Sequence, residues 1–175
     1  MSTAVVDATA EHIPAIQTIY AHWVLHGLAS FEEVPPEASE MDRRRLSVQE
    51  LKLPYLVAQD NGAVLGFAYA GPYRPRSGYR FTVEDSVYVA PGAHGRGIGR
   101  YLLSEVVARA EALGRLQMLA IIGDSGNAAS IGLHAALGFR QIGTMRSIGF
   151  KFGRWVDTVV MQRALGPGDS TLPKS

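Results

Sequence analysis

One stretch, residues 84–99, constrains the fold more than any other part of the chain. It reads Glu-Asp-Ser-Val-Tyr-Val-Ala-Pro-Gly-Ala-His-Gly-Arg-Gly-Ile-Gly, which predicts a strand, a glycine-rich loop and the beginning of a helix. Gly95, Gly97 and Gly99 leave backbone N–H groups uncovered, and such groups at a helix N-terminus attract anions. The helix dipole adds to this attraction. The stretch therefore predicts a site for a phosphate-bearing cofactor, with the carboxylate of Glu84 just upstream, as a cofactor-dependent group transferase requires.

Two other phosphate-binding patterns fit this stretch less well. A dinucleotide site needs G-x-G-x-x-G; Gly95 and Gly97 match it, but Arg100 stands at the third glycine position and no ribose-binding acid follows. A P-loop needs Gly-Lys-Ser/Thr, which is missing. The glycines could also serve only a tight turn, but three within five positions at a helix start exceed what a turn requires.

Composition sets the broad class. The 175 residues suit one domain, and 47% hydrophobic with 19% charged residues is ordinary for a globular protein. The net charge of +1, with both signs interspersed, indicates neither nucleic acid nor a membrane surface as a partner. The absence of cysteine excludes disulfides, thiolate metal sites and a cysteine nucleophile. With no signal-peptide pattern, no membrane-length apolar run and no metal-ligand constellation among the histidines, we expect a cytoplasmic protein without a metal.

Apolar periodicity and turn residues predict the order of the elements. Asn61-Gly62 between two apolar runs predicts a hairpin, and alternation along residues 81–89 places Asp85 and Glu84 on opposite faces of a strand. The segment around Gly149 and Gly153 is expected to be a loop. We expect strands at 4–6, 55–59, 64–70, 81–89, 116–122, 139–144 and 154–161, and helices at about 10–27, 37–51, 98–113 and 127–137.

This order predicts an α/β fold with a mixed, mostly antiparallel twisted sheet of six to seven strands, flanked by about four helices. The crossover from the strand at 81–89 through the helix at 98–113 predicts one parallel pair. We expect a single domain over 1–165 and a flexible C-terminal tail over 166–175.

These motifs resemble the GNAT N-acetyltransferase superfamily. His94-Gly95-Arg96-Gly97-Ile98-Gly99 is similar to its Q/R-x-x-G-x-G/A signature, with His94 at the Gln/Arg position. Residues 127–139 resemble N-x-x-A-x-x-L-Y-x-x-x-G-F, with His134 at the tyrosine position. The segments at 70–73, 82–89, 126–134 and 151–155, with Ser30-Phe31, resemble the phosphinothricin and methionine sulfoximine acetyltransferase branch.

The resemblance implies acetyl-CoA as co-substrate. It places the pyrophosphate on the backbone of the glycine loop and the pantetheine along the strand edge, where one N–H polarises the thioester carbonyl. Arg96 or Arg100 would add charge. Asn127 is also a natural helix N-cap, and Ser130 shares its helix face. The implied cofactor-binding residues are Val87, Tyr88, Val89, Gly95, Arg96, Gly97, Ile98, Gly99, Arg100, Asn127 and Ser130.

Glu84 is the candidate general base, acting directly or through water; otherwise it is a surface or salt-bridged glutamate. His134 is the candidate acid or proton relay, and its alternative is a capping or core-edge histidine. Tyr88 is an alternative acid. Because the chain has no cysteine for an acetyl-enzyme thioester, we expect direct transfer.

The acceptor is expected to be the α-amine of a small amino-acid analogue: phosphinothricin, methionine sulfoximine or methionine sulfone. Paired arginines suit a carboxylate or phosphinate, although Arg74 and Arg76 could equally be solvated loop residues and Phe31 and Tyr73 could be packing residues. The candidate substrate-binding residues are Phe31, Tyr73, Arg74, Arg76, Glu84, Asp85 and Ser86.

Three readings of the function stay open. A polyamine, an aminoglycoside or a protein N-terminus could be the acceptor, or the domain could be a non-catalytic acyl-CoA sensor. A nucleotide-binding oxidoreductase fits least, because the third glycine is missing. The resemblance also implies a homodimer, with the hairpin at Lys151–Trp155 as a possible contact.

Overall fold

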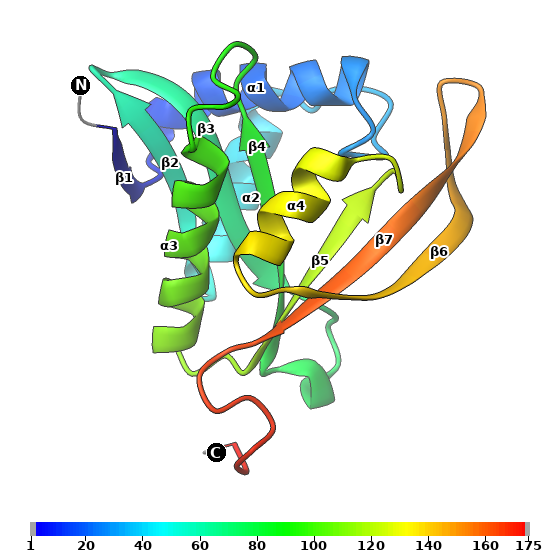
Figure 1. The fold of residues 1–175 in the computed structure, drawn as a ribbon. Helices are drawn as coiled ribbons and strands as arrows, with labels where there is room; N and C mark the ends of the chain where they lie inside the picture. The colour runs from blue at the N-terminus through cyan, green and yellow to red at the C-terminus, as the bar shows by residue number, and fades with distance from the viewer. Residues whose placement is uncertain (1–2, 174–175) are drawn as a thin grey trace.

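A seven-stranded mixed sheet runs through the molecule in the order β1-β2-β3-β4-β5-β7-β6 (Figure 1). The computed structural model describes residues 3–173. Its strands are β1 (Ala4–Asp7), β2 (Tyr55–Asp60), β3 (Ala63–Pro72), β4 (Thr82–Val89), β5 (Gln117–Gly123), β6 (Arg140–Lys151) and β7 (Arg154–Ala164). Its helices are α1 (Ile13–His26), α2 (Ala38–Glu50), α3 (Ile98–Ala112) and α4 (Ala128–Ala136), with short 3₁₀ turns η1 (Ala10–His12) and η2 (Ser77–Tyr79).

The predicted parallel pair is confirmed, and it is shorter than either of its strands. β4 and β5 pair in parallel from Thr82–Gln117 to Asp85–Ala120, whereas the other neighbouring strands are antiparallel. Each of the two strands continues beyond this pairing, β4 to Val89 and β5 to Gly123. The sheet therefore opens between its two central strands, directly after Asp85.

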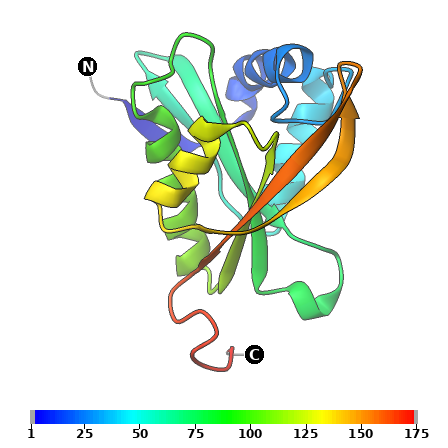
Figure 2. The ribbon, with the colours of Figure 1, turned by 45° about the vertical axis from the view of Figure 1, so that its right-hand side comes forward.

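Helices cover both faces of the sheet. The α3 and α4 helices lie on one face, and α1 and α2 lie on the other (Figures 1 and 2). The apolar positions of α3 form one buried stripe, which packs onto β2, β3 and β4. Burying such a stripe is what stabilises an amphipathic helix in a protein. The buried residues of α3 are Ile98, Leu102, Leu103, Val106, Val107 and Ala110.

The hairpin prediction at Asn61-Gly62 is confirmed, because both residues adopt positive φ, 49° and 81°, between β2 and β3. The prediction of a loop between the strands at 139–144 and 154–161 is wrong over residues 145–151. β6 continues to Lys151, and the turn that follows holds Gly153 at φ 72°. Register shifts on either side of residues 143–145 and a positive φ of 51° at Ser147 break the alternation of side chains. Pairing with β7 holds this segment as a strand, although it lacks the regular alternation of side chains that is typical of a strand.

Two negative findings apply to residues 3–173. No helix in this range is long and apolar enough to cross a membrane. Likewise, the described residues contain no group of three or more His, Asp or Glu side chains placed to hold a metal ion.

Candidate active site

The glycine loop and the open end of the β4–β5 pair enclose a cleft. Its main cavity has a volume of about 480 Å³. One wall comes from the end of β4, one from the start of α3 and one from α4. The residues that line it are Trp23, Ala29, Val87, Tyr88, Val89, Ala93, His94, Gly95, Gly97, Ile98, Gly99, Arg100, Asn127, Ala129, Ser130 and Leu133.

The three glycines of the loop serve different physical needs. Gly95 and Gly97 adopt φ of 74° and 77°, a region that side chains with a Cβ rarely occupy. Gly99 is helical, but a Cβ there would lie 3.3 Å from the Leu133 side chain and 3.4 Å from Val89. Gly97 is the N-cap of α3 and no side chain caps that helix, so its first N–H groups face the cavity side uncovered. This is the geometry of an anion site.

The two arginines of the loop point to different places. Arg100 lines the cavity, where its charge can reach a phosphate. Arg96 lies 3.8 Å from the carboxylate of Asp60 in the β2–β3 hairpin and does not line the cavity. The structure thus brings Arg100, rather than Arg96, to the cleft.

A second, smaller cavity of about 50 Å³ adjoins the cleft where β4 and β5 separate. It shares Ala29, Val87, Tyr88, Asn127 and Ser130 with the main cavity. Asp85 and His134 line only the smaller one. Polar groups therefore gather at the closed end of the cleft, where the pairing of β4 with β5 stops at Asp85.

As predicted, the alternation of side chains along β4 places the carboxylates of Glu84 and Asp85 on opposite faces of the strand. Asp85 points toward α4, whereas Tyr88, on the opposite face, packs edge-on against Tyr20 of α1 with ring centroids 5.1 Å apart. Glu84 shares the face of Tyr88. Burial, and then the charge of Asp85, raise the pKa of Glu84. A half-buried carboxylate with a raised pKa is suited to accept a proton near neutral pH.

The start of α4 supplies the remaining polar groups. Asn127 caps the helix, because its side chain accepts a hydrogen bond from the Ser130 N–H at 3.1 Å. His134 lies two turns further along, and its Nε2 is 3.0 Å from the Asp85 carboxylate. Sequence reasoning placed Asp85 among the substrate contacts and missed this pairing.

The connection between α1 and α2, residues 27–37, closes one side of the cleft. Ala29 of this connection lines both cavities. The Lys151 ammonium donates to the carbonyls of Gly27 at 3.0 Å and Ser30 at 2.6 Å, and its residue is only 1% exposed. Figures 1 and 2 show the β6–β7 hairpin beside this connection.

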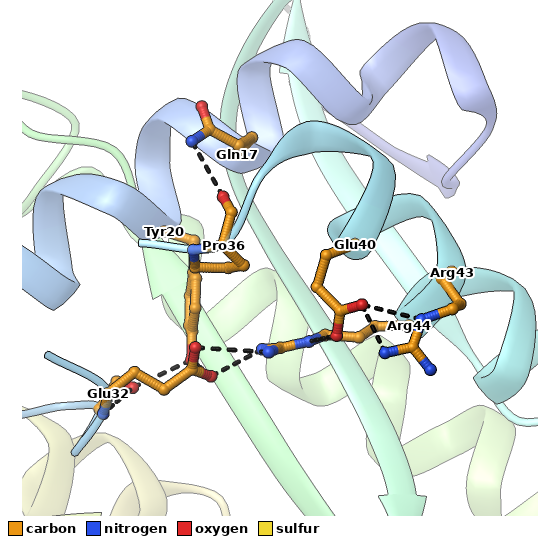
Figure 3. A network of polar contacts seen from close by, with 8 residues as sticks. Gln17, Tyr20, Glu32, Pro36, Glu40, Arg43 and Arg44 are labelled. Atoms are coloured by element: carbon orange, nitrogen blue, oxygen red, sulfur yellow. Dashed lines mark hydrogen bonds and ion pairs between the residues drawn. The ribbon is translucent and has the colours of Figure 1, made fainter. Parts of the chain in front are cut away.

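The same connection is held from its other side by a polar network on α1 and α2 (Figure 3). The Tyr20 hydroxyl donates to Glu32 at 2.8 Å, and Arg44 binds both oxygens of Glu32 at 2.6 and 3.3 Å. Arg44 also donates to Glu40 at 2.7 Å. Burial raises the pKa of Tyr20 to about 12, so the hydroxyl keeps the proton that it donates.

Of the candidate acceptor residues, Asp85 and Ser86 line the small cavity, whereas Phe31, Tyr73, Arg74 and Arg76 line neither cavity. Arg74 stacks over the rings of Tyr73 and Tyr79 at 5.1 and 5.9 Å, in an exposed loop before β4. Neither Arg74 nor Arg76 lines the two cavities. The Phe31 ring lies against Gly149, where a Cβ would come within 2.6 Å of it. Phe31 thus joins the α1–α2 connection to β6.

Sequence reasoning also missed Trp23, whose indole N–H donates to the Val89 carbonyl at 2.9 Å and so holds α1 against the end of β4. Trp23 falls on an apolar helix face, which gave it only a packing role. Lys151 lies beside Phe152-Gly153 in a predicted loop, and nothing local indicates that it is buried.

A cleft at a split parallel pair, with a glycine-loop anion site at one end and buried acid–base groups at the other, defines an acyl-group transferase that uses a phosphate-bearing carrier. Comparison with known proteins is consistent with this class. The model of the acetyltransferase (GNAT) family matches residues 19–139. The chain therefore belongs to the GNAT family and is an acetyl-CoA-dependent N-acetyltransferase.

Individual relatives cover nearly the whole chain. It is 59% identical to a phosphinothricin N-acetyltransferase of Alcaligenes faecalis, over 94% of this chain and 83% of the relative. It is 43% identical to an L-methionine sulfoximine/L-methionine sulfone acetyltransferase of Pseudomonas aeruginosa, over 95% and 97%. A crystal structure of a phosphinothricin acetyltransferase from Sinorhizobium meliloti with acetyl-CoA superposes with a TM-score of 0.96 at 48% identity, covering 100% of this chain and 95% of that one.

Proposed function

We propose that the protein moves an acetyl group from acetyl-CoA to the α-amine of a small amino-acid analogue, with phosphinothricin, methionine sulfoximine and methionine sulfone as its acceptors. The observation that carries the proposal is the position of Glu84. This half-buried carboxylate with a raised pKa directly precedes Asp85, which lines the small cavity, and lies three positions before Val87, where β4 begins to form a wall of the main cavity. The names of the relatives support the choice of acceptor class.

The cofactor end of the cleft follows from the geometry of the loop. The uncapped N–H groups of α3 and the guanidinium of Arg100 would hold the pyrophosphate. Residues 87–89 of β4, which have no β5 partner, would receive the amide-bearing arm of acetyl-CoA. A β4 N–H aimed at the thioester carbonyl would stabilise the oxyanion of the tetrahedral intermediate.

Glu84 would take the proton from the acceptor ammonium, which frees the amine lone pair for attack on the thioester carbon. Glu84 lies on the face of β4 opposite Asp85, so the acceptor approaches from the side of α1, α2 and their connection. The carboxylate or phosphinate of the acceptor would be bound by Arg74 and Arg76, which requires their loop to move toward Glu84. Phe31 and Tyr73 would contact the side chain of the acceptor, and Ser86 would lie beside it.

The exposed apolar side chains on β6 and β7 support the proposal that two copies associate through this hairpin. Ile148, Phe150, Phe152 and Trp155 are each at least 55% exposed, which is unusual for large apolar residues so close together. Light scattering after size exclusion at micromolar concentration should give a mass of two chains, and a mass of one chain would contradict the dimer.

Thiol release from acetyl-CoA tests the function. The purified protein is offered phosphinothricin, methionine sulfoximine and methionine sulfone, beside spermidine and an aminoglycoside. We expect turnover with the amino-acid analogues alone. Turnover with the polyamine or aminoglycoside alone would overturn the acceptor class, and acetyl-CoA binding without thiol release would favour a sensor.

Glu84→Gln tests the base. The amide keeps the shape of the side chain but cannot accept the proton, so kcat should fall by about 10²–10⁴-fold while the acetyl-CoA Kd is retained. Glu105→Gln, on the exposed side of α3, is the matched control and should leave both constants unchanged. Wild-type kcat in Glu84→Gln would remove Glu84 from the mechanism.

A further inference from the structure

Asp85 and His134 form a buried acid–base pair at the closed end of the cleft. The Nε2 atom of His134 lies 3.0 Å from Oδ2 of Asp85, and the two side chains are 3% and 2% exposed. The other carboxylate oxygen, Oδ1, is buried and has no hydrogen-bond partner among the described residues. A net charge at such a place would be costly, so the pair is most stable when its two members together are neutral.

The partners of the ring fix the number of protons on the pair. Nδ1 of His134 lies 2.7 Å from the Ser130 carbonyl oxygen, which can only accept, so Nδ1 carries a proton. A second proton must lie between Nε2 and Oδ2, because otherwise a lone pair would face a carboxylate oxygen. Whichever of these two atoms holds that proton, the pair is neutral.

The surroundings keep that second proton in place. Burial raises the pKa of Asp85, and although burial disfavours charge on His134, the hydrogen bond and charge of Asp85 outweigh it and raise the pKa of the imidazole. The facing residues of β5, 120–122, are apolar. The ionisable neighbours on β4 are Glu84, whose pKa burial and then the charge of Asp85 raise, and Tyr88, which lines the small cavity together with the pair. On β7, Arg163 binds the Leu137 carbonyl at the C-terminal end of α4.

Ser130 connects the pair with the cleft. Its Oγ lies 3.4 Å from Nδ1 of His134, so the N–H can be shared between the carbonyl and the hydroxyl of the same residue. Ser130 lines both cavities, whereas Asp85 and His134 line only the small one. Catalytic hydrogen bonds are often long without substrate and shorten in the reacting complex.

We propose that Asp85, His134 and Ser130 form a relay that returns a proton to the CoA sulfur; this rests on the proposed function. When the C–S bond of the tetrahedral intermediate breaks, its electron pair leaves on sulfur as a thiolate. The hydroxyl proton of Ser130 moves to the sulfur, and the Nδ1 proton of His134 moves to Ser130 Oγ. The imidazole keeps its Nε2 proton against the Asp85 carboxylate, and the pair, now one charge more negative, takes a proton from water after CoA leaves.

Tyr88 lines both cavities and also carries a hydroxyl, but it fits this role less well. Burial raises the pKa of Tyr88 well above 10, whereas an ordinary thiol has a pKa of about 8.5. Proton transfer from Tyr88 to a thiolate would therefore run uphill and leave a buried phenolate. The relay instead ends with the negative charge on the Asp85 carboxylate, which accepts the Nε2–H of the neutral His134 ring until the pair takes a proton from water.

Two variants, each with a matched control, test the relay through the pH dependence of kcat for thiol release. Asp85→Asn should lower kcat about a hundredfold and abolish the alkaline decline of kcat, because the amide cannot hold the shared proton. Ser130→Ala should lower kcat similarly. Both should keep the acetyl-CoA Kd within about twofold. Asp7→Asn on β1 and Ser104→Ala on α3 repeat the same chemical changes away from the cleft, and both should behave as wild type.

Nitrogen-15 NMR of histidine-labelled protein tests the shared proton without any turnover. The chain has five histidines. His134 should keep both ring nitrogens in proton-bonded states over the pH range in which an imidazole with the ordinary pKa of about 6.5 titrates. Asp85→Asn should convert it to the neutral ring with a proton on Nδ1 alone, and Ser130→Ala should leave its wild-type signal.

Three results would overturn the relay: a His134 that titrates with the ordinary imidazole pKa of about 6.5, wild-type kcat and pH profile in Asp85→Asn or Ser130→Ala, or variants that lose only melting temperature and acetyl-CoA affinity. If Asp85→Asn does not fold, the wild-type spectrum and Ser130→Ala decide. Absence of turnover with every acceptor would instead overturn the proposed function, and the spectrum would still decide whether the proton is shared.

Discussion

Lys151→Met should loosen the wall of the cleft from a site outside it. The Lys151 ammonium is buried and donates to the carbonyls of Gly27 and Ser30, on either side of the cleft residue Ala29. Methionine fills a similar volume but donates nothing. Loss of the ammonium leaves both carbonyls without this donor, and the Phe31–Gly149 contact then remains to hold the α1–α2 connection against β6.

The size of the effect follows from these two bonds. Hydrogen bonds from a charged donor contribute about 1.5–3 kcal/mol each, or about 3–6 kcal/mol for two. Burial of the ammonium offsets part of this, and the same burial lowers the pKa of Lys151. We expect a net loss of about 2–3 kcal/mol, which for a chain of this length lowers Tm by about 4–12 °C.

Urea unfolding gives the free energy, and titration of acetyl-CoA gives the Kd. Lys151→Met should lose stability and bind acetyl-CoA several-fold more weakly, because Ala29 is no longer held in place. Lys52→Met, at an exposed lysine, should stay within about 0.5 kcal/mol of wild type. If Lys151→Met unfolds at the wild-type urea concentration and binds acetyl-CoA equally well, the tether has no energetic role.

Three further predictions follow from contacts of the same site. Glu84 has a raised pKa in the folded chain, so its ionisation costs stability as pH rises through that folded pKa. The Tm of Glu84→Gln at pH 8 should therefore equal or exceed the wild-type Tm. The same variant should also lose the acid limb of the plot of kcat against pH. Gly123→Ala would place a Cβ 2.0 Å from the Leu28 carbonyl oxygen, so a drop of about 1–3 kcal/mol in urea unfolding is expected, and an unchanged midpoint would show that the connection adapts freely. Arg44→Met leaves Glu32 bound by Tyr20 alone, which should raise the KM of the acceptor more than that of acetyl-CoA in steady-state assays; equal changes would contradict a role limited to the acceptor side.

The sequence predicted the architecture because its signals were local. Asn61-Gly62, the stripe of α3 and the glycines of the loop each specify geometry within a few residues. The bulged part of β6 could not be found in this way, since only its pairing with β7 holds it extended. The alternation of β4 predicted that Asp85 and Glu84 point to opposite faces, and this is confirmed.

Contacts between distant segments account for what sequence reasoning missed. Asp85 meets His134 across 49 positions, and Lys151 reaches Gly27 and Ser30 across more than 120. Nothing near any of these residues encodes its partner. The same limit applies to Arg74 and Arg76, whose spacing suits an anion but does not reveal that they lie in an exposed loop outside the cleft.

The early end of the β4–β5 pairing has a consequence for how the protein avoids aggregation. An unpaired strand edge at the rim of a sheet invites a strand from another molecule. The unpaired edge of β4 after Asp85 lies instead between two strands of the same sheet, with α4 over one face. Because β5 follows β4 in the sheet, this edge does not lie at the rim, where a strand of another molecule could extend the sheet. The fold thus keeps the hydrogen-bonding capacity of a sheet edge inside the cleft, where residues 87–89 line the main cavity.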